Sequence, residues 1–341
     1  MTADSFAFSP SIYHRRRMQE IHPALTFDPA DPTGWQRRLR ARFKILLGYD
    51  PPVQRIPLSP KTRWKQSFQT GTVEKIVFHS EPGVDVPAYV CLPARAKPPY
   101  RFFICLQGHS TGMHNSIGVA IDDETRPIKV AGDRNFAIGC MRRGIAALCI
   151  EQRSFGERRE KIQQQASSHP CHDAVMQAIQ LGTTLGAERV FDVDRGIDYL
   201  AARGDCDMKR IGIMGNSGGG TVTIFAAALL PRIAVAMPSC SFCTYRDSIM
   251  QIYHCGDNYV PGIARWAESA DVLGLFAPRP VVIVAGKSDP IFPLCGVRKA
   301  YADLRRIYRA FGAEDQCKLV VGRGGHRFYA AAAWRTMNPP H

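Results

Sequence analysis

Short, almost wholly apolar runs alternate along the chain with longer segments in which apolar residues recur every three or four positions. The short runs are typical of strands buried on both faces, and the longer pattern is typical of amphipathic helices. We predict eight strands, near 72–79, 84–92, 101–106, 144–150, 209–214, 233–238, 280–285 and 317–321. Helices are predicted near 34–47, 132–143, 186–203, 218–230 and 297–312.

This order of elements predicts an α/β fold in one large domain. Strands that alternate with helices form a mainly parallel sheet with helices on both faces, and the first two strands can pair as an antiparallel hairpin. We expect residues 1–68 to be a basic, proline-punctuated helical extension packed on a core domain of residues 69–341. Insertions near 107–131, 151–185 and 239–279 should cover the binding pocket, because ligands of such sheets bind where strands end.

The strand predicted at 209–214 runs into a glycine-rich turn, Gly215-Asn216-Ser217-Gly218-Gly219, at the start of a helix. A nucleophile elbow has this composition, because its serine takes a strained backbone conformation and its neighbours must lack bulk. Ser217 would then be the nucleophile, and the Gly218 N–H would stabilise an oxyanion at the helix N-terminus. A turn that binds phosphate, or that is only structural, has a similar composition and remains an alternative.

Two later strand ends supply an acid and a base in the order Ser, Asp, His that an α/β-hydrolase requires. Asp289 follows the strand at 280–285, and His326 lies in a glycine-rich loop after the strand at 317–321. Asp271 and Asp315 are weaker candidates for the acid, since neither follows a strongly apolar strand, and Asp271 fits a helix cap. Among the histidines, which include His109, His114, His172 and His254, only His326 follows the acid in a strand-end loop.

The loop after the strand at 101–106 is Gln107-Gly108-His109-Ser110-Thr111-Gly112. By its position it should supply a second oxyanion donor, the backbone N–H of His109, with Gly108 allowing close approach of an acyl oxygen. Gln107 stands where many hydrolases have histidine, and we consider it as a substrate contact. An ordinary glycine turn is the alternative.

Composition agrees with a globular protein in a reducing compartment. The 341 residues are 45% hydrophobic, no run of eighteen apolar residues occurs, and the N-terminus does not read as an export signal. We expect a cytoplasmic protein that does not bind membranes. The eleven scattered cysteines do not form a disulfide framework. A zinc site at Cys240 and Cys243, with Cys255 and the Cys171-His172-Asp173 segment, is a minor alternative because a second close-spaced ligand pair is missing.

The net charge of +14 raises the question of nucleic acid. The basic residues concentrate in the first 65 positions without a nucleic-acid-binding motif, so we expect a solvated or subunit-facing surface and no nucleic-acid partner. A homo-oligomer is compatible with such a surface.

The chain resembles the acetyl xylan esterase-like, dienelactone hydrolase-related branch of the α/β-hydrolase superfamily over roughly residues 10–335. The resemblance rests on the elbow, the acid loop at 286–293, the base loop Gly324–Tyr329, the segment Leu181–Leu200 and Asn258–Gly262. It implies a triad of Ser217, Asp289 and His326 with His109 and Gly218 as oxyanion donors, and substrates such as acetylated sugars, cephalosporin acetyl groups and other small esters. Dienelactone hydrolases use a cysteine nucleophile, so the serine of this chain argues against lactones.

The same resemblance aligns Glu151–Glu157 with the Asp-x-Arg-Gly-x-Gly stretch of the deacetylases. Arg153 is therefore a candidate for binding a substrate hydroxyl or carboxylate, although a structural ion pair is the favoured role. Tyr259 is a candidate for the pocket wall, with packing as its alternative.

Together these patterns predict a serine carboxylic-ester hydrolase that needs no metal or cofactor and works through an acyl-enzyme. Its substrate would be a small ester, most plausibly an acetylated carbohydrate. A prolyl oligopeptidase-like peptidase is the enzymatic alternative, but 341 residues leave no room for the propeller of that family. A non-catalytic α/β-hydrolase-fold binding protein is the other alternative.

Overall fold

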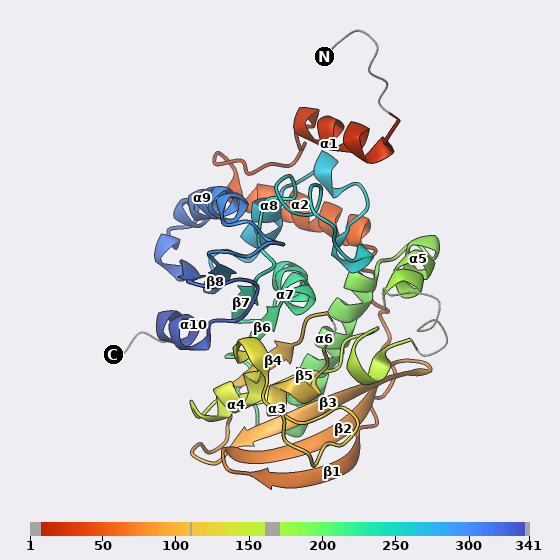
Figure 1. The fold of residues 1–341 in the computed structure, drawn as a ribbon, viewed down its shortest axis with the longest axis vertical. Coiled ribbons are helices and arrows are strands. Elements are labelled where there is room, and N and C mark those ends of the chain that lie inside the picture. The colour runs from red at the N-terminus through yellow and green to blue at the C-terminus, as the bar shows by residue number, and fades with distance from the viewer. Residues whose placement is uncertain (1–7, 110, 161–170, 338–341) are drawn as a thin grey trace.

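A nine-stranded sheet organises the computed structural model, which describes residues 8–109, 111–160 and 171–337 (Figure 1). The strands are β1 (Lys61–Phe68), β2 (Gly71–Glu81), β3 (Val84–Pro93), β4 (Phe102–Leu106), β5 (Ala146–Ile150), β6 (Gly212–Asn216), β7 (Val235–Ser239), β8 (Val281–Gly286) and β9 (Cys317–Gly322). Their order is β1-β2-β3-β5-β4-β6-β7-β8-β9. Strands β4 to β9 pair in parallel, and β2 and β3 form the expected antiparallel hairpin, so the predicted mainly parallel sheet is confirmed.

The predicted count of eight strands is wrong, because β1 lies inside the segment assigned to the N-terminal extension. It pairs antiparallel with β2 at the edge of the sheet. Its sequence, KTRWKQSF, has only two large apolar residues, and none of its residues is fully buried. An edge strand of this kind lacks the apolar run that revealed the others.

The helices cover both faces of the sheet. They are α1 (Pro10–Glu20), α2 (Pro32–Leu47), α3 (His114–Ile117), α4 (Phe136–Met141), α5 (His172–Gln180), α6 (Leu185–Arg203), α7 (Gly218–Leu229), α8 (Ser269–Gly274), α9 (Leu294–Ala310) and α10 (Ala330–Met337). Helices α2, α6, α7, α8 and α9 enclose one core, while α3, α4 and α10 enclose the other. Within β4, Phe102 and Ile104 face the first core and Phe103 faces the second, as strand alternation requires. None of the described helices is long and apolar enough to cross a membrane.

Helix α2 ties the N-terminal segment to the first core. Asp31 caps it by accepting a hydrogen bond from Gly34 N–H at 2.9 Å, Pro32 opens it, and Gly48 ends it in the left-handed conformation. Its apolar face is buried against the rest of the core and consists of Trp35, Leu39, Phe43 and Leu47. The N-terminal segment therefore contributes to the stability of the whole domain.

We expect Phe43→Ala to destabilise the protein by about 3–5 kcal/mol, the usual cost of removing a buried phenylalanine side chain. Phe43 is fully buried and packs edge-on against Phe225 of α7. Chemical denaturation followed by circular dichroism measures the change in the free energy of unfolding. Ile45→Ala on the exposed side of the same helix is the control, and an equal loss in both variants would contradict the prediction.

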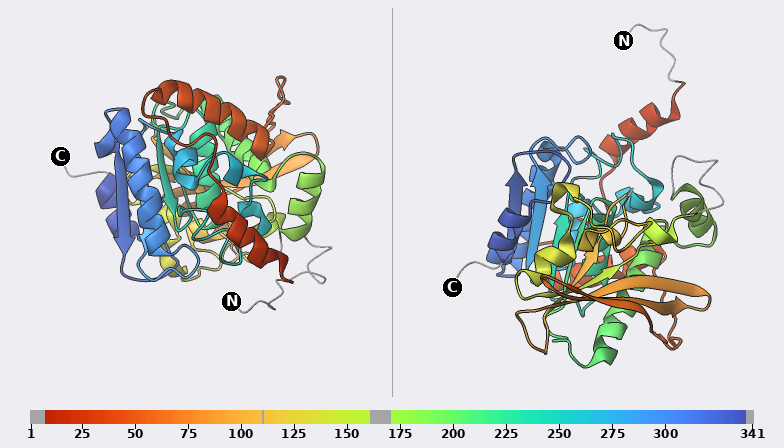
Figure 2. Two further views of the ribbon diagram at one scale, coloured as in Figure 1. Left: turned by 90° about the horizontal axis from the view of Figure 1, so that it is seen from above. Right: turned by 60° about the horizontal axis from the view of Figure 1, so that its bottom comes forward.

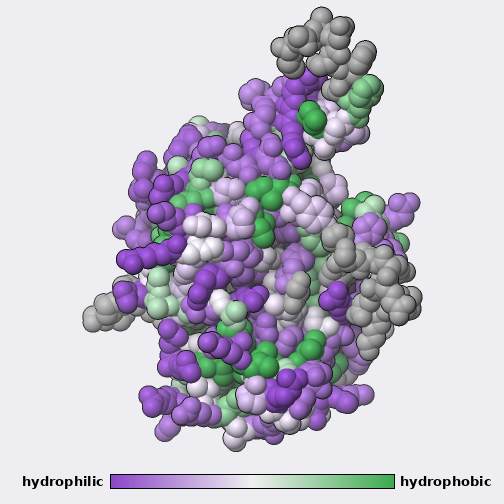
Figure 3. Space-filling model, in the orientation of Figure 1, coloured by the Kyte–Doolittle hydropathy of each residue, from purple (hydrophilic) through white to green (hydrophobic). Residues whose placement is uncertain are grey.

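Helix α1, by contrast, projects from the body of the molecule (Figures 1 and 2). Met18 is its buried residue, and Arg246 donates hydrogen bonds to the carbonyls of Met18, Gln19 and Ile21 at its end. In the space-filling view the helix is mainly hydrophilic, in agreement with exposed Arg15–Arg17 (Figure 3). Part of the positive charge predicted for the N-terminal region is thus carried on a solvated helix.

Candidate active site

The carboxyl ends of four parallel strands converge on the candidate site. Ser217 follows β6, Asp289 follows β8, His326 lies in the loop after β9, and Gly108 and His109 follow β4. Parallel strands bring their carboxyl ends to one edge of a sheet, where open α/β folds bind ligands. The structure therefore gathers the sequence-predicted residues at one edge.

Ser217 occupies a strained turn between β6 and α7. Its φ is +57° and its ψ is −124°, a conformation that non-glycine residues seldom adopt. A Cβ atom on Gly219 would lie 2.2 Å from the carbonyl oxygen of Leu106, and one on Gly215 would lie 2.4 Å from the backbone of Gly219. The glycines are needed because backbone segments meet here, and the turn has the geometry of a nucleophile elbow.

Asp289 and His326 form a hydrogen-bonded pair, with Nδ1 of His326 2.9 Å from Oδ2 of Asp289. The other carboxylate oxygen accepts the N–H groups of Ile291 and Phe292 at 2.9 and 3.1 Å. Burial opposes the charge on Asp289, but the hydrogen bonds from His326 and from the two N–H groups outweigh it and lower the pKa of the carboxyl group. The pair thus consists of an ionised carboxylate and an imidazole oriented by it.

The competing acid, Asp271, lies elsewhere. It belongs to the capping box of α8, where it accepts the N–H groups of Glu268 and Phe27. The expectation that Asp271 caps a helix is confirmed.

Within the described residues Ser217 makes no side-chain hydrogen bond to His326, so the structure does not join the serine to the pair directly. Catalytic hydrogen bonds are often long in unliganded enzymes and tighten when substrate binds. Ser217 and Asp289 nevertheless follow strands that are close in the sheet, because only β7 lies between β6 and β8 and it pairs with both.

The loop after β4 lies directly beside the elbow. A Cβ atom on Gly108 would lie 2.9 Å from Cβ of Ser217. The backbone N–H groups of His109 and Gly218 have no acceptor among the described residues. Gly218 opens α7, where N–H groups lack partners inside the helix. Two free N–H groups beside a serine hydroxyl have the composition of an oxyanion hole.

The proposed substrate-binding residues differ in what they contact. The side chain of Gln107 is buried and donates to Ser116 Oγ and to the Arg134 carbonyl, both at 2.8 Å, so it holds the loop and is not available to a substrate. Arg153 forms ion pairs with Glu81, Glu188 and Asp192, which is the structural role favoured from the sequence. Tyr259 is partly exposed, and its hydroxyl donates to the Ile249 carbonyl at 3.0 Å.

Several residues around the site were not singled out from the sequence. The Phe292 ring stacks on the His326 ring with 6.0 Å between the ring centroids. The His254 ring packs edge-on against Phe292, with 5.1 Å between their centroids. Burial and the nearby charges of His109 and His326 lower the pKa of His254 to about 4. Phe292 belongs to the acid loop at 286–293, and His254 lies in the insertion at 239–279 without a motif of its own, so only the folded structure reveals these ring contacts.

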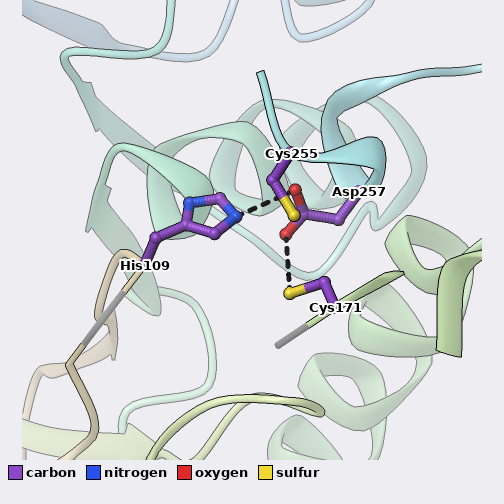
Figure 4. A group of neighbouring side chains, drawn as sticks. All are labelled: His109, Cys171, Cys255 and Asp257. Atoms are coloured by element: carbon purple, nitrogen blue, oxygen red, sulfur yellow. Dashed lines mark hydrogen bonds and ion pairs between the residues drawn. The ribbon is translucent and has the colours of Figure 1, made fainter. Parts of the chain in front are cut away.

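The predicted insertions meet around the side chain of His109 (Figure 4). His109 comes from the first, Cys171 from the second, and Cys255 and Asp257 from the third, and one potential ligand atom of each lies within 4.8 Å of the others. Ser110 and residues 161–170, which belong to the predicted oxyanion loop and the second insertion, lie outside the described residues. The cysteines considered for zinc are thereby separated, because Cys240 lies instead with Asp289 and His326.

Comparison with known proteins gives the same fold. YtaP of Bacillus subtilis (strain 168), a proposed hydrolase, is 26% identical over 290 residues, which are 84% of this chain and 92% of YtaP. A proposed acetyl xylan esterase from Bacteroides fragilis NCTC 9343 superimposes with a TM-score of 0.75 at 14% identity, covering 99% of this chain and 86% of that one. A glucuronoyl esterase from Solibacter usitatus gives 0.65 at 14% identity, covering 98% and 100%. The model of the Abhydrolase family matches residues 8–306, and the chain, with its α/β-hydrolase fold, belongs to that family.

Proposed function

We propose that the protein is a serine esterase that hydrolyses short-chain acyl esters, most plausibly acetyl esters of carbohydrates or similar small molecules. The observation that carries the proposal is the strained Ser217 at the end of β6, beside two unoccupied N–H groups and at the same sheet edge as the Asp289–His326 pair. Backbone strain of this kind persists where function requires it.

In the proposed mechanism His326 removes the proton of the Ser217 hydroxyl as the serine attacks the ester carbonyl. The N–H groups of His109 and Gly218 stabilise the oxyanion of the tetrahedral intermediate, and the alcohol leaves with a proton from His326. Water, activated by the same imidazole, then attacks the acyl-enzyme and releases the acid. Asp289 holds the ring in orientation and stabilises its charged form.

A small cavity lies near the elbow, although Ser217, Asp289 and His326 are not part of its described lining. A cavity of about 210 Å³ lies beside the β4 loop, below the range that drug-sized ligands occupy. Its described lining is Thr111, His114, Ile121, Ser154, Phe155, Gly156 and Arg159. Phe155 also contacts the His109 ring, so the cavity adjoins the proposed oxyanion hole. The names of the structural neighbours, acetyl xylan esterase and glucuronoyl esterase, favour carbohydrate esters over the peptides of the alternative proposal.

Stoichiometric labelling with an organophosphonate tests the proposed function. We expect one adduct per chain, on Ser217 by peptide mass spectrometry, together with hydrolysis of p-nitrophenyl acetate in preference to the octanoate and release of acetate from acetylated oligosaccharides. Adduct formation excludes the non-catalytic binding protein. A protein that neither reacts with the phosphonate nor cleaves any ester would refute the proposal.

Removal of divalent metals should leave this activity intact, because the proposed chemistry uses a hydroxyl, an imidazole and peptide N–H groups alone. We expect full esterase activity after prolonged dialysis against EDTA and 1,10-phenanthroline, while phosphonate treatment of the same sample abolishes it. The rate of p-nitrophenyl acetate hydrolysis measures both effects. Activity that disappears with chelator and returns with zinc would instead require a metal mechanism.

A further inference from the structure

The imidazole of His109 is hydrogen-bonded to the buried carboxylate of Asp257, and both oxygens of that carboxylate accept further hydrogen bonds. Nε2 of His109 lies 3.0 Å from Oδ1 of Asp257 (Figure 4). The same oxygen accepts from the Asn258 amide at 3.0 Å. The second oxygen accepts from the Arg189 guanidinium and lies 3.8 Å from Cys171 Sγ. The Asp257 side chain is fully buried, and that of His109 is 24% exposed. The ring is thus anchored at one nitrogen and reaches solvent elsewhere.

This cluster contains zinc-type ligands, but its charges oppose a bound cation. Arg189 is fully buried, donates to both Asp257 and Cys171 Sγ, and lies over the Phe155 ring at 4.2 Å. Its remaining N–H groups donate to the Arg153 carbonyl at 2.7 and 3.1 Å. A permanent cation that is fixed against two of the four ligand candidates repels a metal ion, and Asp257 is already satisfied without one.

The same arrangement favours a charged imidazole. Burial of the ring disfavours its charge, but the negative charge of Asp257 and the hydrogen bond to it outweigh burial and raise the pKa of His109 to about 9. Burial also opposes ionisation of Asp257, yet Arg189 and His109 lower the pKa of its carboxyl group. A pKa raised in this way favours a proton on both nitrogens of His109 at neutral pH.

The other edge of the ring faces the elbow. A Cβ atom on Gly218 would lie 2.8 Å from Cε1 and 3.0 Å from Nδ1 of His109, so Nδ1 is beside the first residue of α7. Nδ1 has no hydrogen-bond partner among the described residues. A protonated nitrogen next to a helix N-terminus, with no acceptor in the described part of the chain, creates a site for negative charge. The negative charge expected at this position is the oxyanion of the acyl transfer.

We propose that His109 contributes its side chain as well as its peptide N–H to the oxyanion hole, with the Nδ1–H of a charged imidazole donating to the developing oxyanion. The inference rests on the proposed esterase function and deepens it: His109 is a catalytic residue whose charge is maintained by Asp257, and Arg189 keeps that carboxylate ionised. A charged donor adds Coulomb attraction to its hydrogen bond with an anion, which a neutral donor does not provide. The hole is therefore selective for the charged intermediate over the neutral ester.

The proposal predicts a descending limb in the pH profile. As pH rises through about 9, His109 loses its Nδ1 proton, and kcat for p-nitrophenyl acetate should fall by about 10- to 100-fold, somewhat less than the usual cost of losing an oxyanion donor because both N–H groups remain. Of the other groups around the ring, Arg189 stays charged, Cys171 and His254 have lowered pKa values, and Cys255 has a raised one. His109 is thus the group in this cluster that titrates near pH 9.

Three variants separate this role from simple packing. His109→Asn can place a neutral amide near the position of Nδ1, so kcat should drop by about 10- to 100-fold at pH 7.5 and the descending limb should disappear. Asp257→Asn removes the charge that raises the pKa of His109, so the descending limb should move to lower pH. His172→Ala, at an exposed histidine of α5, is the matched control and should keep the wild-type profile.

A measurement on the wild-type protein keeps the test independent of folding and of activity. In a protein labelled with ¹⁵N-histidine, the resonances absent from the His109→Asn spectrum belong to His109, and they should report a doubly protonated ring at pH 7.5. A neutral ring, or a descending limb that His109→Asn retains, would overturn the proposal. If the phosphonate labels Ser217 while these outcomes fail, the esterase function stands and only the role of the imidazole is lost. If labelling fails, the proposed function itself is wrong.

Discussion

Ser217→Ala is expected to lower kcat by about 10⁴-fold or more, the largest effect of any single substitution in this chain. The hydroxyl forms the covalent acyl-enzyme in the proposed mechanism, and no neighbouring side chain can replace it. Steady-state hydrolysis of p-nitrophenyl acetate measures the loss, and phosphonate labelling should vanish in the same variant.

The fold should survive this change, because Ser217 makes no side-chain hydrogen bond within the described residues and alanine is no larger. Far-ultraviolet circular dichroism and the midpoint of thermal unfolding provide the control. Residual esterase activity above about a tenth of wild type, in a variant free of contaminating enzyme, would reject Ser217 as the nucleophile.

Asp289→Asn should cost on the order of 10³ to 10⁴ in kcat. The amide retains the size of the carboxylate and can still accept the N–H groups of Ile291 and Phe292, but it no longer provides the charge that stabilises the imidazolium of His326. It can also turn its NH₂ group toward Nδ1 and favour the wrong tautomer of the ring. The loss should therefore appear in kcat at all pH values, with stability changed far less.

Asp271→Asn is the matched control for this prediction. Burial raises the pKa of Asp271 to about 7, so this carboxyl group is only partly charged near neutrality, and its contacts are two backbone N–H groups of the N-terminal segment and α8. We expect activity within a factor of about three of wild type and a loss of about 1 kcal/mol in stability, as for a helix cap. If Asp271→Asn abolishes activity and Asp289→Asn does not, the acid has been misassigned.

The comparison between Asp257 and Asp289 shows how one site uses two carboxylates differently. Both are buried beside a histidine, at 3.0 and 2.9 Å, and both have lowered pKa values. Asp257 is also paired with the fixed cation Arg189, whereas Asp289 is held by peptide N–H groups. In our proposals the first keeps a histidine charged, and the second orients a histidine that must be neutral to accept a proton.

The sequence alone was sufficient for the parallel core and for the strand-end residues. The strands β4 to β8 are short runs because both of their faces are buried, and such runs are visible without any knowledge of pairing. The edge strand β9 keeps an apolar run although Lys318 and Val321 are exposed. Ser217, Asp289 and His326 each stand just beyond such a run, so their approach to one edge follows from parallel pairing. The glycines of the elbow can also be recognised from the local sequence, because the turn has no room for side chains at these positions.

The tertiary structure decided the features that depend on contacts between distant segments. β1 has too few apolar residues to be recognised, and only its pairing with β2 makes it a strand. Gln107 and Arg153 occupy promising positions in the sequence, yet their partners from other segments of the chain hold them in structural contacts. His109 was predicted for its backbone alone, because Asp257, which orients and charges its ring, and Arg189, which keeps Asp257 ionised, come from distant segments of the chain. Local patterns report what a residue's own segment requires, while the charge of a buried group is set by whichever segments pack around it.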